Sequence, residues 1–292
     1  MRATPAMLVL TLLTAVVIGG SWWLGRDRVD AARAGAEPDQ PAQALAPTRE
    51  VAELALPDPL PQTTVDVPIL LYQRVAVVTG EEDPALIART VEAQEFQLQL
   101  EWLRDEGYEA ISLLELYKAL MEGGSLPDKP VVLAFMGGHR GTASVAAPRM
   151  ADAEMIGVVC AVTGKLPRRR AASPDRLTWG MLRELEARGW DIASETTAEE
   201  PITGAGAAEA AERLTTSQDK LEKILGHPVQ WLCYPGGEAD ATAAEAARAA
   251  GYVLGIAEGA GTTQSATTPL QLNAIPVDNR TGVRDLTELL GG

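Results

Sequence analysis

The fold is decided by residues 131–140, which read Val131-Val132-Leu133-Ala134-Phe135-Met136-Gly137-Gly138-His139-Arg140. The first five are apolar, rich in β-branched side chains and preceded by Pro130. A short, continuous apolar run predicts a strand that is buried on both faces, as in parallel sheets. The Gly-Gly pair then turns the chain sharply. Because ligands of parallel α/β folds bind at the carboxyl ends of strands, a site is expected just after Phe135.

The chain around this stretch alternates strand-like and helix-like segments. Alternation of this kind predicts a parallel sheet with right-handed crossovers, but it leaves open whether the sheet closes into a barrel or stays an open, doubly wound sheet. The predicted strands cover residues 67–72, 110–112, 131–135, 156–162, 190–194, 229–233, 252–257 and 272–277. The predicted helices cover 93–106, 113–121, 144–153, 178–188, 207–225, 241–250 and 284–290.

The N-terminal part of the chain has a different composition. Residues 6–24 are almost uniformly apolar, with Arg2 before them and Arg26 after them, and their length is close to the ~20 residues of a membrane-spanning helix. We predict an uncleaved signal anchor over residues 1–26, with a cleaved signal peptide as the alternative. Residues 27–64, rich in Ala and Pro, predict a disordered linker. The domain predicted over 65–292 would then lie on the periplasmic side of the inner membrane as part of a single-pass protein.

Composition limits the partners. The 292 residues carry a net charge of −15, which argues against nucleic acid because phosphates require Lys and Arg. The one basic cluster, Arg168-Arg169-Arg170, predicts a solvated loop, with contact to an anionic glycan as the alternative. Cys160 and Cys233 both lie in apolar strand-like runs and are predicted to be buried free thiols.

Residues 134–140 resemble the strand and loop of the polysaccharide deacetylases (carbohydrate esterase family four, the NodB homology domain). The family pattern there is Thr-Phe-Asp-Asp-Gly, followed by an aromatic residue and often Arg. Phe135, Gly138 and Arg140 match it, but Met136 and Gly137 replace the two aspartates. The resemblance covers roughly residues 66–280 and implies an irregular (β/α)7 barrel.

Three further segments match the family in order. Tyr72-Gln73-Arg74-Val75 resembles the family's Tyr-His-Arg-Val, with Gln73 in place of His. Leu177-Thr178-Trp179 resembles the start of a helix that precedes the family's metal-histidine strand. Tyr234-Pro235-Gly236-Gly237 resembles its Tyr-Pro-Tyr-Gly groove wall, with Gly236 in place of the second aromatic residue.

The family's metal and catalytic residues are replaced in this chain. Residues 194–199 read Ser-Glu-Thr-Thr-Ala-Glu where the family has Ser-His-Thr-x-x-His. The resemblance thus puts the metal-ligand positions at Gly137, Glu195 and Glu199, and the catalytic base at Met136. A catalytic zinc needs about three protein ligands, so we expect no zinc or other divalent cofactor and no family catalysis. A weak Ca²⁺ or Mg²⁺ site on the two glutamates is the alternative.

Three functions follow as hypotheses. The first is a catalytically inactive, polysaccharide deacetylase-like pseudoenzyme of the cell envelope that binds a glycan or an envelope protein. The second is a carbohydrate deacetylase, hydrolysing the C–N bond of N-acetylated glycans, whose rebuilt chemistry uses Glu195, Glu199 or His139. The third is a structural envelope protein. The residues expected to line the groove are Tyr72, Gln73, Met136, His139, Arg140, Glu195, Glu199, Tyr234 and Pro235.

Overall fold

The computed structural model of the protein describes residues 53–80, 82–169 and 172–291. The predicted signal anchor over residues 1–26 and most of the predicted linker lie outside these residues. Within the described part of the chain, no helix combines the length and the apolar character needed to cross a bilayer.

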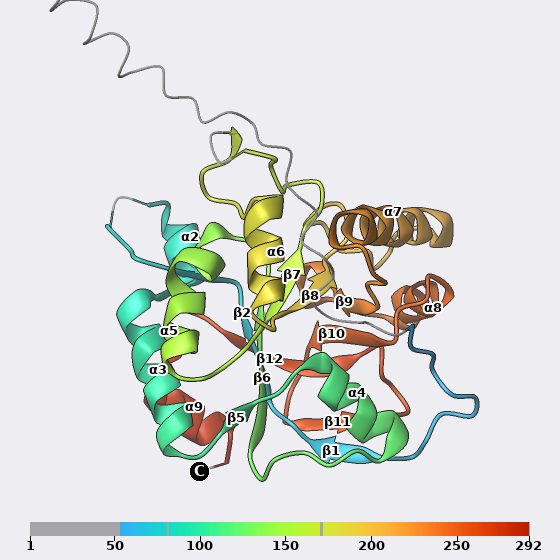
Figure 1. Ribbon diagram of the computed structural model, residues 1–292, viewed down its shortest axis with the longest axis horizontal. Helices are drawn as coiled ribbons and strands as arrows, with labels where there is room; N and C mark the ends of the chain where they lie inside the picture. Colours follow the sequence, from blue (N-terminus) through green and yellow to red (C-terminus); the bar gives the residue numbers. More distant parts are fainter. Residues whose placement is uncertain (1–52, 81, 170–171, 292) are drawn as a thin grey trace, which may run out of the picture. The chain divides into compact units, whose positions relative to one another are not determined.

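Seven parallel strands form a closed barrel (Figure 1). Going around the barrel, β2 pairs with β12, followed by β10, β9, β8, β7 and β6, and a further pairing of β2 with β6 closes the ring. The predicted (β/α)7 barrel is therefore confirmed. Its strands are β2 (Ile69–Tyr72), β6 (Pro130–Phe135), β7 (Val158–Ala161), β8 (Asp191–Ser194), β9 (Trp231–Cys233), β10 (Leu254–Glu258) and β12 (Leu272–Val277).

The central strand β6 is buried along its whole length because it has apolar neighbours on both sides. Val132 and Ala134 pack with Ile69 and other residues that fill the barrel. The alternate side chain of Leu133 packs with those beneath the outer helices. Side chains of a strand alternate between its two faces, so both sets must be apolar. This is the burial that the apolar run at 131–135 predicts.

Helices surround the barrel (Figure 1). Ser112 begins α4 with a capping box that it forms with Glu115, and Thr178 caps α6 through Met181 N–H. The predicted helix 144–153 is instead a π-helical turn, η2 (Thr142–Ala146), that continues into α5. Pro148 has no N–H to donate in a regular α-helical pattern. The helices are α2 (Pro84–Ala88), α3 (Ala93–Asp105), α4 (Leu113–Glu122), α5 (Ala147–Asp152), α6 (Trp179–Ala187), α7 (Ala207–Leu225), α8 (Ala241–Ala249) and α9 (Val283–Leu289).

Several short elements are absent from the sequence-based prediction because two or three residues carry no measurable periodicity. β1 (Thr64–Asp66) pairs antiparallel with β11 (Thr263–Ser265). β3 (Arg74–Ala76) pairs in parallel with β4 (Thr90–Glu92). η4 (Pro235–Gly237) is a single 3-10 turn. The strand predicted over 110–112 does form, but as the two residues of β5 (Glu109–Ala110), which extends the sheet beside the first residues of β6. The β3–β4 pair matters most, because it lies at the mouth of the barrel.

The predicted linker ends earlier than residue 64. Leu54 exchanges two backbone hydrogen bonds of 2.7 Å with the side chain of Gln230, and the Tyr117 hydroxyl donates to Ala55 O at 2.5 Å. Leu54 and Leu56 also pack against buried apolar side chains. Residues 53–63 lack regular secondary structure, yet they are held against the barrel and belong to the folded domain.

The prediction of two free thiols is wrong. Cys160 of β7 and Cys233 of β9 form a disulfide, with their Cα atoms 5.8 Å apart. Strand β8 lies between them, and its residue in register with Cys160 is Ala193, whose small side chain leaves room for the bridge. The two cysteines are 73 residues apart in sequence, so their proximity follows from the barrel and not from any local pattern.

Candidate functional site

The carboxyl ends of β2, β6, β8 and β9 meet at one end of the barrel, where they enclose a cavity of about 240 Å³. It lies where the Gly-Gly turn after β6 leads one to expect a site. The lining residues are Gln73, Arg74, Leu86, Arg89, Met136, Gly137, His139, Arg176, Glu195, Glu199 and Gly236.

The turn after β6 places the imidazole of His139 against Gly137. Gly137 and Gly138 have φ angles of 77° and 56°, in the left-handed region that favours glycine. A Cβ atom added to Gly137 would lie 2.7 Å from Nε2 of His139 and 3.5 Å from Nη1 of Arg176. The space where a side chain at position 137 would begin is therefore filled by these two residues.

Glu195 is buried directly below this turn, with 2% of its surface exposed. Gly137 N–H donates to its Oε2 at 2.6 Å. Burial raises the pKa of Glu195 to about 8, and the hydrogen bond from Gly137 opposes this rise without cancelling it. At neutral pH most molecules therefore hold Glu195 as a neutral acid, which cannot accept a proton.

A short hydroxyl network shapes the turn that carries the two glutamates. Thr196 has a φ of 57°, a left-handed conformation that is uncommon outside glycine. Its Oγ1 donates to Ala198 O at 2.8 Å, and Ser217 Oγ of α7 donates to Thr196 O at 2.9 Å. These bonds hold the backbone so that Glu195 faces the cavity floor and Glu199 reaches the rim.

Glu199 is an ionised partner of two cations. Its Oε2 lies 2.5 Å from Lys165 Nζ, and its Oε1 lies 2.7 Å from Arg176 Nη1. Partial burial disfavours the charge, but the hydrogen bonds from Lys165 and Arg176 outweigh it and hold the pKa of Glu199 below its ordinary value. This carboxylate is consequently neutralised within the protein.

Arg176 is the central residue of the site, although it is not among the site residues predicted from the sequence. Its Nη1 also donates to Gly137 O at 2.5 Å, across 39 positions of sequence. The loop between β7 and α6 brings it there: Arg140 N–H donates to Asp175 O at 2.8 Å, and His139 and Arg176 form an isolated antiparallel bridge. No motif marks this residue, because its position depends on how two loops pair.

His139 is neutral in this setting. Burial, together with the nearby positive charge of Arg176, lowers its pKa to about 4, although Glu199 has the opposite effect. His139 is one of the three residues that the hydrolase hypothesis gives to the rebuilt chemistry. Its depressed pKa makes it a weak proton acceptor at neutral pH.

The zinc ion that the family resemblance implies does not fit these residues. Gly137 offers no side chain, Glu195 is a neutral acid bonded to Gly137 N–H, and Glu199 is paired with two cations. In the described parts of the chain, no three His, Cys, Asp or Glu side chains are grouped so that they could hold a metal ion. The predicted weak Ca²⁺ or Mg²⁺ site does not fit either, because Glu195 is bonded to Gly137 N–H and Glu199 is paired with Lys165 and Arg176.

Four of the residues expected to line the groove do not line the cavity. Tyr72 and Tyr234 are fully buried, because alternation along β2 and β9 turns them outward beneath the helices while Leu71 and Cys233 face into the barrel. Pro235 is buried as well. Arg140 lies outside the lining, whereas the remaining five expected residues are part of it. They are Gln73, Met136, His139, Glu195 and Glu199.

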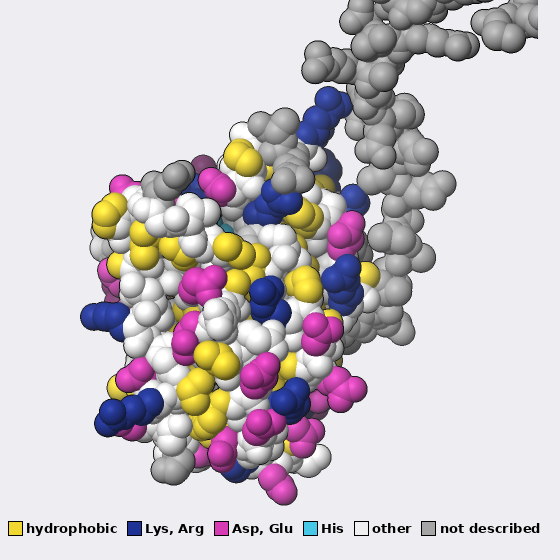
Figure 2. Space-filling model, turned by 90° about the vertical axis from the view of Figure 1, so that its left-hand side faces the viewer, with side chains coloured by type: hydrophobic (Ala, Val, Ile, Leu, Met, Phe, Trp, Pro, Cys, Tyr) yellow, Lys and Arg dark blue, Asp and Glu magenta, His cyan; other side chains and the backbone are white. Residues whose placement is uncertain are grey.

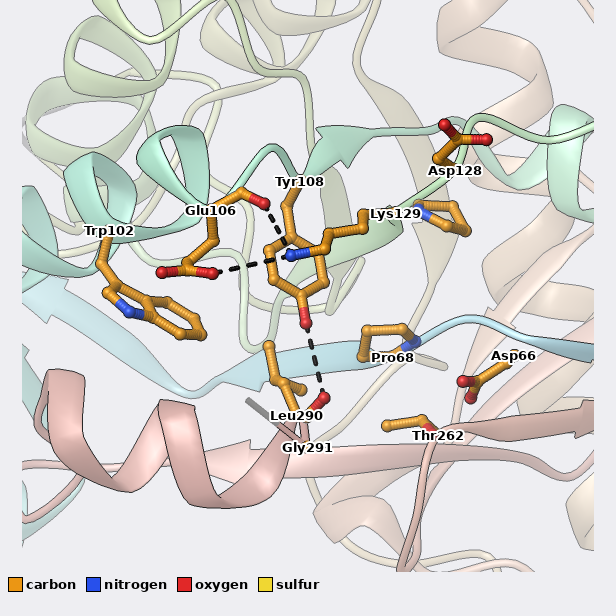
Figure 3. A pocket seen from close by; sticks show the side chains of 11 residues that line it. Asp66, Pro68, Trp102, Glu106, Tyr108, Asp128, Lys129, Thr262, Leu290 and Gly291 are labelled. Carbon is orange, nitrogen blue, oxygen red and sulfur yellow. Dashed lines mark hydrogen bonds and ion pairs between the residues drawn. The ribbon is translucent and has the colours of Figure 1, made fainter.

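A second cavity, of about 220 Å³, lies at the opposite end of the barrel, where Pro68 precedes β2 and Pro130 begins β6. Figure 3 shows the side chains that line it. Lys129 is its one cationic lining residue, against the acidic residues Asp66, Glu106 and Asp128. The Lys129 ammonium lies 5.3 Å from the centroid of the Tyr108 ring and 3.6 Å from the Glu106 carboxylate. The positive charge of Lys129 is therefore paired within the protein. Because the other charged lining residues are acidic, the cavity as a whole is acidic.

Comparison with known proteins supports a domain of the polysaccharide deacetylase type. A family model described as polysaccharide deacetylase matches residues 123–255. The deacetylase PplD of Streptococcus pyogenes, solved in complex with acetate, is 26% identical in sequence. The alignment covers 78% of this chain and 99% of that one, with a TM-score of 0.69.

Two more distant structures show the same fold. IcaB from Ammonifex degensii is 18% identical, with 78% of this chain and 97% of that chain covered and a TM-score of 0.66. BC0361, a polysaccharide deacetylase from Bacillus cereus, is 17% identical, with 78% and 69% covered and a TM-score of 0.65. A search of curated proteins found no match.

Proposed function

We propose that this polysaccharide deacetylase-like domain binds a cell-envelope glycan without hydrolysing it. The observation that carries the proposal is the position of Arg176. Its guanidinium joins Gly137 O to the Glu199 carboxylate, two of the three positions where the family resemblance implies metal ligands. The guanidinium of Arg176 thus occupies the place where the resemblance implies a metal ion. The cavity at the barrel mouth is still present next to it.

Hydrolysis of an amide requires an activated water, and the residues at this site supply no means to activate it. General bases and metal ions each contribute large factors to such reactions. The thioether of Met136 accepts no proton, Glu195 is mostly protonated at neutral pH, and Glu199 is neutralised by Lys165 and Arg176. These three features favour binding over catalysis.

The cavity suits a small ligand group. Its volume of about 240 Å³ is below the ~300–1,000 Å³ of sites for drug-sized molecules. A site of this size holds one sugar unit and not a long chain. The proposed ligand is accordingly a single residue of a glycan, presented at a chain end or at a branch.

The proposed location is the extracytoplasmic side of the inner membrane. The apolar run at residues 6–24 supports it, and so does the disulfide between Cys160 and Cys233. Disulfides persist in oxidising compartments such as the bacterial periplasm and are rare in the cytosol.

The test uses the full-length protein in detergent, with peptidoglycan and chitooligosaccharides as ligands. We expect the protein to sediment with insoluble peptidoglycan, and we expect no acetate release from either glycan, with or without added zinc. Because PplD is a deacetylase, acetate release is the activity to be tested. Acetate release that disappears in Glu195→Gln would establish the hydrolase instead. If the protein neither binds these glycans nor releases acetate from them, the proposal is rejected, and binding of an envelope protein becomes the remaining hypothesis.

A further inference from the structure

We infer that the ligand of the cavity at the barrel mouth is an acidic sugar whose carboxylate is bound by Arg74, Arg89 and Arg176. The inference rests on the proposed glycan-binding function and narrows it to one class of glycan. Of the three side chains, only Arg74 belongs to a family motif, whereas Arg89 and Arg176 lie outside the motifs, so the resemblance does not predict that the three converge.

The charges that line the cavity are predominantly positive. Three arginines face two glutamates. Glu199 is shared between Arg176 and Lys165, and the arginines outnumber the glutamates even when Glu195 is ionised. The cavity therefore has a surplus of positive charge in a chain whose net charge is −15. On the face shown in Figure 2, by contrast, acidic and basic side chains are interspersed.

The arginines converge from three places in the chain. Arg74 begins β3, and it is in register with Thr90, the first residue of β4, which directly follows Arg89. The short β3–β4 pair therefore brings two of the arginines to one side of the mouth. Arg176 arrives on the loop before α6. Arg176 and Arg74 both lower the pKa of His139, which places their two charges near the same imidazole; Asp175 and Glu199 act in the opposite direction.

The three arginines have N–H donors that are free to bind a ligand. Among the described residues, the side chain of Arg74 makes one hydrogen bond: its Nη1 donates to Thr90 Oγ1 at 3.0 Å. Both contacts of Arg176, to Gly137 and Glu199, also use Nη1 alone. The exposed guanidinium of Arg89 makes no hydrogen bond or ion pair with the described residues. A guanidinium has five N–H donors in a planar fork that matches a carboxylate, often with two parallel bonds.

The remaining lining groups suit the sugar that carries the carboxylate. Gln73 offers an amide that both donates and accepts, and neutral His139 adds one donor and one acceptor. Met136 and Leu86 provide apolar contact for the face of a ring. The cavity thus offers a matching group for each part of an acidic sugar: arginines for the carboxylate, polar side chains for the hydroxyl groups and apolar side chains for the ring.

The experiment measures binding by titration calorimetry with the full-length protein in detergent. The probe is a trisaccharide of uronic acids, and the matched ligand is the same trisaccharide with its carboxylates reduced to alcohols. We expect the acidic trisaccharide to bind at least about tenfold more tightly, as hydrogen bonds to charged groups imply. Arg74→Gln and Arg89→Gln should each remove most of that preference, and added salt should weaken it.

The matched control is Lys129→Gln, which removes one cation from the cavity at the opposite end of the barrel and should leave the affinity unchanged. Equal affinity for both trisaccharides, with no effect of the arginine variants, would overturn the inference and leave glycan binding intact. Binding of neither trisaccharide, nor of peptidoglycan, would remove the proposed function with it. Inorganic phosphate that displaces the trisaccharide at equal concentration would show recognition of a bare anion, which also contradicts the inference.

Discussion

Nη1 of Arg176 lies 2.7 Å from Oε1 of Glu199, and the same nitrogen donates to the carbonyl oxygen of Gly137. The pair links the loop before α6 to the loops after β6 and β8. A guanidinium keeps its charge at every physiological pH and cannot dissociate from the protein as a metal ion can. The positive charge at this barrel mouth is therefore part of the covalent chain.

Removal of that guanidinium should destabilise the fold. In Arg176→Gln, Glu199 keeps Lys165 as its cation but loses a short charged hydrogen bond. We expect a loss of about 1–2 kcal/mol in the free energy of unfolding, at the lower end for charged groups because Glu199 is partly exposed. Urea unfolding measures it. Arg188→Gln, at an exposed position after α6, is the control and should change stability by less than about 0.5 kcal/mol.

Metal ions should leave the stability of the protein unchanged. A ligand that binds the native state raises the melting temperature in proportion to the logarithm of its concentration over its Kd. Since the site residues do not fit zinc, neither added zinc nor EDTA should shift the Tm. Thermal unfolding with and without each is the measurement. A rise of several degrees with stoichiometric zinc, lost in Glu195→Gln, would show that the glutamates bind metal after all.

Much of the fold follows from sequence because its signals are local. The apolar run of β6, the N-caps at Ser112 and Thr178 and the helix over 207–225 each depend on residues that are near neighbours in the chain. The closure of the barrel does not. Alternation of strands and helices is common to barrels and open sheets, and the family resemblance was needed to choose between them.

The site was less predictable, for two physical reasons. Motif comparison finds residues that replace a known functional residue, so it located Glu195 and Glu199 but not Arg176, whose position depends on the pairing of two loops. It also assumes that a matching residue has a matching environment. Tyr72 and Tyr234 match the family's groove residues, but strand alternation turns their rings into the hydrophobic core.

The buried acid at the cavity floor should make stability fall as the pH rises. The pKa of Glu195 is raised from 4.5 to about 8 in the folded protein, so the native state binds a proton that the unfolded state releases. Stability from this group is complete below pH 4.5 and is lost as the pH rises toward 8, at up to about 1.4 kcal/mol per pH unit. Urea unfolding between pH 7 and pH 8 measures the slope, because below that range the lowered pKa of buried His139, about 4 instead of 6.5, makes stability change in the opposite direction.

The Glu195→Gln variant isolates that contribution. Gln keeps an oxygen that can accept from Gly137 N–H, and it has no charge to bury. Its stability should depend less on pH than that of the wild type and should exceed it near pH 8. Glu200→Gln, at the exposed neighbouring position, should retain the wild-type slope. Equal slopes in wild type and Glu195→Gln would mean that another group causes the pH dependence.

The disulfide inside the barrel should contribute a large part of the stability. It closes a loop of 73 residues, and in the chain-entropy model a loop of this length is worth about 4 kcal/mol. A Cys160→Ala, Cys233→Ala double variant should lose roughly that amount in urea, and reductant should destabilise the wild type alone. The variant also removes two buried sulfur atoms next to the small side chain of Ala193, and the gap that they leave within the barrel adds to the loss. Thiol titration first verifies that the reductant has produced two free cysteines in the wild type. If the reduced and oxidised proteins then unfold at the same urea concentration, the disulfide does not stabilise the fold.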